Sequence, residues 1–158
     1  MSPEEERKAA GVAKEYRNDR IAVYWEPTYC IHVANCLVGN PKVFDAMRRP
    51  WIDLSEADAD EVAEVVMSCP TGALHFLRLD GGEQETASEE TTAYERPNGP
   101  LFVRGRSRIV GQDGTLLRED TRVAPCRCGQ SANKPFCDNA QEDRFPNGLA
   151  RRAQHVAR

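Results

Sequence analysis

The chain is organised around one stretch, residues 126–141, which reads Cys126-Arg-Cys128-Gly-Gln-Ser131-Ala-Asn-Lys-Pro135-Phe-Cys137-Asp138-Asn139-Ala-Gln141. Three cysteines fall within twelve positions, and turn-forming residues separate them. The stretch has no apolar run that would bury these cysteines as core thiols. A short polar loop of reduced cysteines is typical of a metal or cluster site. Thiolates favour zinc, Cu(I) or iron–sulfur clusters, and the residue types alone leave these alternatives open.

The spacing in this stretch resembles the CDGSH-type iron–sulfur motif, C-x-C-x2-[ST]-x3-P-x-C-D-G-x-H. The residues at their motif positions are Cys126, Cys128, Ser131, Pro135, Cys137 and Asp138. The glycine position holds Asn139, for which we expect a positive φ that asparagine tolerates. The resemblance implies a [2Fe–2S] cluster on the three cysteines.

The histidine ligand of the motif is replaced by Gln141, which offers only a neutral amide oxygen. The fourth ligand therefore stays open. The candidates are Gln141 itself, Asp143, a water molecule, a residue of a partner, or His155 brought back by the chain.

Composition narrows the class of protein. The chain has 158 residues, 29% of them charged and 40% hydrophobic, with a net charge of −4. We therefore expect no nucleic-acid partner and no attraction to anionic membranes. No stretch approaches the ~20 apolar residues of a membrane helix, and the first residues lack a signal core. These features predict a cytoplasmic protein with reduced thiols, so its six cysteines are not expected to form disulfides.

The other three cysteines form a second set: Cys30, Cys36 and Cys69, the last followed by Pro70. This set resembles a ferredoxin pattern, C-x2-C-x2-C early and C-P late, with Val33 in the middle slot. Residues 21–79 resemble the divergent single-cluster ferredoxin domain that is often joined to CDGSH motifs in bacteria. That resemblance implies a [3Fe–4S] or [4Fe–4S] cluster, with His32 as a candidate additional ligand.

Local patterns predict the elements of this first domain. Residues 21–25 are expected to form a strand, and Ser55 with Asp58 is expected to cap a helix that ends near Cys69. Residues 73–79 alternate as a half-buried strand does, which places His75 on the exposed face. Helical spacing after Pro41 predicts a core-facing set, namely Val43, Phe44 and Met47.

The remaining segments complete an α+β organisation. Residues 1–20 are predicted to be a charged tail, residues 80–98 an acidic linker and residues 146–158 a basic tail. Residues 99–145 form the CDGSH-like domain, in which Asp113-Gly114 is a hairpin turn signal. The fold class is thus a small ferredoxin-like α/β domain followed by a small β-rich cluster domain.

These patterns predict an electron-transfer protein with two clusters, and no enzyme motif is visible. The ferredoxin resemblance implies redox partners such as a flavin reductase and an oxygenase of the cytochrome P450 type. The alternatives are a cluster carrier or redox sensor, and a single-cluster ferredoxin whose second site binds zinc or stays empty. We expect a monomer or a homodimer, with packing between residues 21–79 and 99–145 as the monomeric solution.

Overall fold

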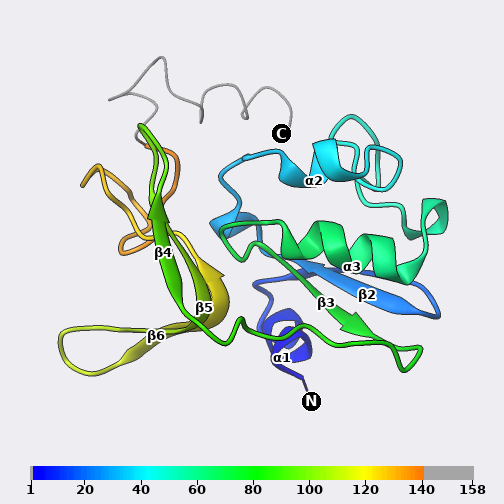
Figure 1. Ribbon diagram of the computed structural model, residues 1–158, viewed down its shortest axis with the longest axis horizontal. Helices are drawn as coiled ribbons and strands as arrows, with labels where there is room; N and C mark the ends of the chain where they lie inside the picture. The colour runs from blue at the N-terminus through cyan, green and yellow to red at the C-terminus, as the bar shows by residue number, and fades with distance from the viewer. Residues whose placement is uncertain (1, 141–158) are drawn as a thin grey trace.

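The computed structural model describes residues 2–140 and has an α+β fold with two antiparallel sheets (Figure 1). The first sheet has the order β1-β2-β3, from β1 (Lys14–Arg17), β2 (Ile21–Trp25) and β3 (Leu74–Arg78). The second has the order β4-β5-β6, from β4 (Thr92–Glu95), β5 (Leu101–Val110) and β6 (Leu116–Val123). The predictions for Gln141, Asp143, His155 and the basic tail lie outside the described residues.

Short helices connect and cover the first sheet. They are α1 (Pro3–Ala9), η1 (Pro27–Tyr29), α2 (Asn35–Gly39), η2 (Leu54–Glu56) and α3 (Ala59–Met67). Asp58 begins α3 as predicted, but its capping partner is Glu61, because Ser55 bonds to Asp53 instead. No helix in the described part of the chain is long and apolar enough to cross a membrane.

The larger core lies between α3 and one face of the first sheet. Ile21 and Val23 of β2 pack there with Phe76 of β3 and the buried face of α3. Val43 and Phe44 join this core from a turn rather than from a helix. The prediction for Met47 was wrong, since its side chain is 90% exposed.

Residues 2–20 differ from the predicted charged tail. Ser2 and Glu5 form a capping box that starts α1, and β1 is paired with β2 along its whole length. The sequence of α1 shows no apolar pattern that would indicate an ordered helix, because none of its side chains is fully buried. Pairing with β2 supplies the backbone hydrogen bonds that composition does not reveal.

The acidic linker is packed rather than a free tether. Gln84 exchanges hydrogen bonds with the backbone of Arg78, and Glu85 contacts His75 and Phe76 of β3. Residues 92–95 then form β4 against β5. This docking covers His75, which is only 2% exposed, so the prediction of an exposed His75 was wrong.

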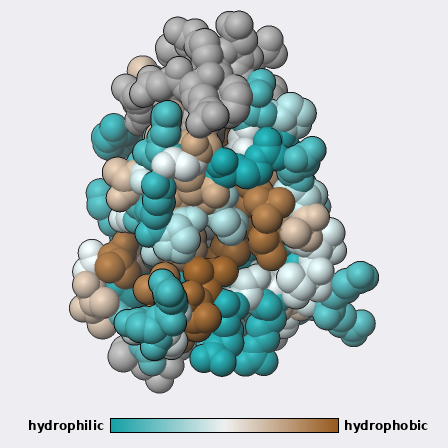
Figure 2. All heavy atoms as spheres, turned by 90° about the vertical axis from the view of Figure 1, so that its left-hand side faces the viewer, coloured by the Kyte–Doolittle hydropathy of each residue, from teal (hydrophilic) through white to brown (hydrophobic). Residues whose placement is uncertain are grey.

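The predicted hairpin is present in β5 and β6, with Gly114 at its turn and a positive φ of 86°. Figure 2 shows apolar side chains among polar ones on the face of the molecule that carries the second sheet. The large apolar residues exposed on these strands are Tyr94, Val110, Leu116 and Leu117.

Candidate cluster sites

The first cysteine set is assembled from three separate connections. Cys30 follows η1, Cys36 lies in α2 and Cys69 follows the end of α3. All three line one small cavity, together with Trp25, Trp51 and the segment from Ile31 to Asn35. The structure therefore brings together the three cysteines that the sequence predicted as ligands.

The loop between Cys30 and Cys36 has an unusual backbone. His32 and Ala34 have positive φ angles of 60° and 71°, a region that side chains other than glycine seldom adopt. Nδ1 of His32 lies 3.8 Å from Sγ of Cys30. Val33 lines the cavity in the position of the missing cysteine. His32 thus remains a candidate ligand by position, and Val33 contributes only apolar surface.

Two thiols of this cavity, those of Cys30 and Cys36, have raised pKa values. Burial raises the pKa of Cys36 to about 12, and the neighbouring Cys69 and Cys30 add to the shift. Burial raises the pKa of Cys30 as well. Thiolates bind metals, so the cavity needs the positive charge of iron to hold them in that form. The donor set and its burial fit an iron–sulfur cluster.

The second cysteine set lies in the loop after β6. Sγ of Cys126 and Sγ of Cys128 are 3.9 Å apart, while Cys137 is buried. Backbone amides point at the sulfurs: Gln130 donates to Cys128 and Asn139 to Cys137, each at 3.4 Å. Such bonds stabilise a thiolate and tune a bound cluster.

Backbone and side-chain bonds hold this loop in shape. Ala124 and Cys126 are bonded across the loop to Cys137 and Pro135. Ser131 donates to the carbonyl of Phe136, and Asp138 accepts from the amides of Ala132 and Ala140. Asn139 has a φ of 74°, which confirms the prediction for the motif's glycine position.

The amides also affect the pKa of Cys126. Burial raises this pKa, but hydrogen bonds from the backbone of Ser131 and Gly129 favour the thiolate, and the pKa falls below its ordinary value. The second loop therefore offers a more readily ionised thiol than Cys36 does.

The spacing of the sulfurs tests the zinc alternative. A tetrahedral zinc with bonds of about 2.3 Å places its sulfurs roughly 3.8 Å apart. The pair Cys126 and Cys128 meets this distance. However, no three cysteine sulfurs within residues 2–140 all lie within 4.8 Å of one another. In this structure each set is therefore more widely spaced than the sulfurs around one bound zinc ion would be.

The two cysteine sites adjoin each other. Ile31 and Val33, which line the first cavity, belong to the same buried apolar cluster as Cys137. Next to these residues, Tyr29 and Phe136 pack edge to face with ring centroids 5.2 Å apart. The predicted packing between the two modules is thus present, and it occurs at the cysteine loops.

Two arginines of β6 reinforce this interface. Arg122 is completely buried and donates to the backbone oxygens of Val66, Cys69 and Leu74 and to the carboxylate of Glu85. Arg118 donates to Glu26, and its guanidinium lies 3.7 Å from the ring centre of Tyr29. Arg122 therefore fixes the backbone of Cys69 from the strand that leads to the second site.

Gly72 allows this close approach. A Cβ on Gly72 would lie 2.3 Å from the carbonyl oxygen of Arg122, and the φ of Gly72 is +72°. A side chain here would push β6 away from the loop that carries Cys69.

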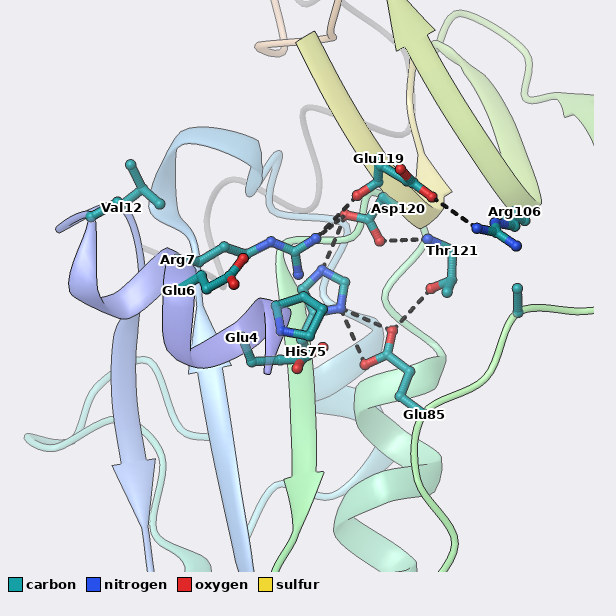
Figure 3. A pocket seen from close by; sticks show the side chains of 13 residues that line it. Glu4, Glu6, Arg7, Val12, His75, Glu85, Arg106, Glu119, Asp120 and Thr121 are labelled. Atoms are coloured by element: carbon teal, nitrogen blue, oxygen red, sulfur yellow. Dashed lines mark hydrogen bonds and ion pairs between the residues drawn. The ribbon is translucent and has the colours of Figure 1, made fainter. Parts of the chain in front are cut away.

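A cavity of about 720 Å³ between α1, β3, the linker and β6 contains a further cluster of ionisable groups (Figure 3). His75 lies between the carboxylates of Glu85 and Asp120, at 2.9 Å and 3.1 Å. Glu4 approaches closely enough for Glu4, His75 and Glu85 to surround a cation. However, both nitrogens of His75 are already bonded, and the Arg122 guanidinium lies 3.3 Å from Nδ1. We interpret the group as a buried ion-pair network.

Comparison with known proteins identifies both domains. The family model described as "Divergent 4Fe-4S mono-cluster" matches residues 16–79, and the model "Iron-binding zinc finger CDGSH type" matches residues 98–140. Over 61 residues the chain is 41% identical to "Uncharacterized protein YjdI" of Escherichia coli strains K12 and O157:H7. The match covers 39% of this chain and 80% of each relative. The chain belongs to the divergent 4Fe-4S mono-cluster family.

This mono-cluster family protein carries a CDGSH iron-binding domain in addition, so the predicted fusion is confirmed. Both domains bind iron–sulfur groups in their families, and the chain is accordingly an iron–sulfur protein. No solved structure matches it.

Sequence reasoning missed the polar residues that join the two domains. In the sequence Arg122 is only one of several charges on the second strand of the predicted hairpin, and Glu85 lies within the predicted acidic linker. A weak signal was present in the alternation of β6, because Arg118, Asp120 and Arg122 occupy every second position and so share a face. An alternating face with both charges is expected to be solvated, and only the docking of the other domain buries it.

Proposed function

We propose that this protein transfers single electrons through two iron–sulfur clusters. The residues that would hold a [3Fe–4S] or [4Fe–4S] cluster are Cys30, Cys36 and Cys69, with His32 as a candidate ligand. Those that would hold a [2Fe–2S] cluster are Cys126, Cys128 and Cys137, with Gln141 as a candidate ligand. When bound, such clusters supply one-electron exchange over a wide range of potentials.

The observation that carries this proposal is the contact between the two cysteine sites. Cys137 packs in one buried cluster with Ile31 and Val33, and those two residues line the first cavity. Two unrelated metal sites would not need to adjoin. Placing them together shortens the distance between the clusters and excludes water from the space between them.

The first experiment measures iron, acid-labile sulfide and zinc per chain on protein purified without oxygen. Two clusters predict about five or six irons and no zinc. Electron paramagnetic resonance of the oxidised and reduced forms should show a [3Fe–4S] or [4Fe–4S] signal beside a [2Fe–2S] one, each broadened by the other wherever both clusters are paramagnetic, because the sites adjoin. Cys137→Ser should remove the second signal and sharpen the first. Three or four irons with one zinc would contradict the proposal and support a single-cluster ferredoxin with a zinc site.

The alternative that Gln141 favours is a cluster carrier or redox sensor. A weak fourth donor in place of histidine would release the second cluster more easily. This alternative predicts rapid transfer of the [2Fe–2S] cluster to an apo-ferredoxin, with the first cluster retained. An electron-transfer protein would keep both clusters through repeated reduction and oxidation.

The proposed role is that of an electron carrier and not of an enzyme. Its partners would be redox proteins, such as a flavin reductase and an oxygenase like a cytochrome P450, in the cytoplasm. Reduction of the purified protein by a flavin reductase with NADH or NADPH, followed at visible wavelengths, tests this partner class.

A further inference from the structure

A surface groove of about 210 Å³ lies beside the first cysteine site. Lys14 and Tyr16 of β1 form one wall, and Arg49 forms part of the other. Trp25 and Trp51 line this groove and also line the cavity that contains the three cysteines. The two indoles are therefore a wall shared by the groove and the candidate cluster site.

This wall is an ordered aromatic unit. Trp25 and Trp51 pack edge to face with centroids 5.0 Å apart, and Tyr16 contacts Trp51 at 6.4 Å. Phe44 supports Trp51 from the core at 5.8 Å. Aromatic residues that are already fixed in place are favoured in protein interfaces, because little conformational entropy is lost on binding.

The rim of the groove is positively charged. Lys14 and Arg49 line the groove, and Arg48 donates to the carbonyl of Pro50, which lines it too. None of these three cations forms an ion pair with a carboxylate in the part of the chain that the structure describes. Arg48 and Arg49 donate to backbone oxygens, which fixes the guanidinium groups but does not neutralise their charge. This basic rim stands out in a chain whose net charge is −4.

An exposed apolar side chain adjoins the rim. Met47 is 90% exposed and follows Ala46, which lines the groove. The carboxylate of Asp45 accepts from the backbone amide of Met47 and so fixes the start of this turn. Methionine is unbranched and adapts to an apolar partner surface.

We propose that this groove is a docking surface for a redox protein whose own contact surface is acidic. The inference rests on the proposed electron-transfer function, because it places a partner next to the first cluster. The unpaired cations would attract such a partner and orient it. The shared tryptophan wall would keep the protein layer between the partner and the cysteine site thin. A basic partner would be repelled at the same rim.

Binding measurements on the cluster-loaded full chain test this surface. The probe is an oxidised flavodoxin, an acidic flavin protein, at low ionic strength in a calorimeter. Lys14→Glu should raise the dissociation constant about tenfold or more. Added salt should also raise the dissociation constant of the wild type. The matched control is Arg20→Glu, an exposed cation at the other end of the β1–β2 hairpin, which should change binding less than about twofold. Carbodiimide cross-linking should attach the probe through Lys14.

Three results would overturn the docking surface: no salt-dependent binding, equal weakening by both variants, or tighter binding of the basic protein cytochrome c. A redox titration of the same samples separates this inference from the proposed function. Reversible reduction of both clusters together with unchanged binding in Lys14→Glu would reject the docking surface alone. Failure of the clusters to reduce reversibly would reject the proposed function.

Discussion

His75 illustrates how the surroundings of one residue decide its charge. Its side chain is buried, and its two ring nitrogens bond to Glu85 and Asp120. Burial alone lowers the pKa of His75, but the two carboxylates more than compensate and raise it to about 9. Arg122 and Glu4 face the same ring with opposite charges. His75 is therefore a cation at neutral pH, part of an ion-pair network.

The raised pKa makes a prediction about stability and pH. An unfolded histidine has a pKa near 6.5, so the stabilisation by His75 is complete below that pH and is lost as pH rises through about 9. The loss amounts to about 3 kcal/mol. Urea unfolding between pH 6 and 10 should show this decline in the wild type and a much smaller one in His75→Gln. The same decline in both proteins would disprove the assignment.

Asn139 gives a second prediction at this scale. Its φ of 74° lies in the left-handed region, and its amide donates to Sγ of Cys137. Asn139→Gly should preserve the loop, whereas Asn139→Ala should cost about 1 kcal/mol because alanine tolerates this conformation less well. Unfolding by urea and the rate of cluster loss both measure the effect. Equal behaviour of the two variants would show that the backbone angle is unimportant.

At the scale of elements, the segment between β3 and β4 is held by Glu85. Its carboxylate accepts from Arg122, Thr121 and His75, and its side chain is 5% exposed. These interactions lower the pKa of Glu85 to about 2 despite the effect of burial, which raises it. Together with Gln84, which bonds to the backbone of Arg78, this carboxylate holds the acidic, glycine-rich segment in the packed structure.

This role predicts different effects for two glutamates of one segment. Glu85→Gln removes the carboxylate that His75 and Arg122 share and should lower the free energy of unfolding by about 3 kcal/mol. Glu89→Gln, at an exposed position, should change it by less than about 0.5 kcal/mol. Limited proteolysis should cut residues 80–90 faster in Glu85→Gln only. Equal cutting of both variants would contradict the docking of this segment.

At the scale of the whole molecule, Arg122 links the two modules through one buried side chain, and we expect this link to make them unfold as one cooperative unit. It reaches from β6 to the backbone of α3, of Cys69 and of β3. Arg122→Met should therefore split a single unfolding transition into two. Fluorescence of Trp25 and Trp51 reports the first module, and visible absorption of the second cluster reports the other. Arg106→Met, at a surface position of β5, should leave the two signals coincident.

The sequence by itself determined the cysteine sets and the elements that carry them. Three of these features depend on short-range geometry, which residue types at fixed spacing encode. They are the spacing of the residues from Cys126 to Cys137, the Cys69-Pro70 pair and the turn at Asp113-Gly114. The strand at residues 21–25 and the cap at Asp58 belong to the same class. Local patterns are sufficient where each residue's partner lies a few positions away.

Only the tertiary structure decided what lies between the two modules. Three features depend on partners far away in the chain. They are the burial of His75, Arg122 and the Glu85 carboxylate, the order of residues 2–20, and the packing of Val33 against the apolar cluster that contains Cys137. A charged residue on an alternating strand looks solvated unless another module covers it. Burial of an ion-pair network is a collective property of several segments, so no single stretch of this sequence could reveal it.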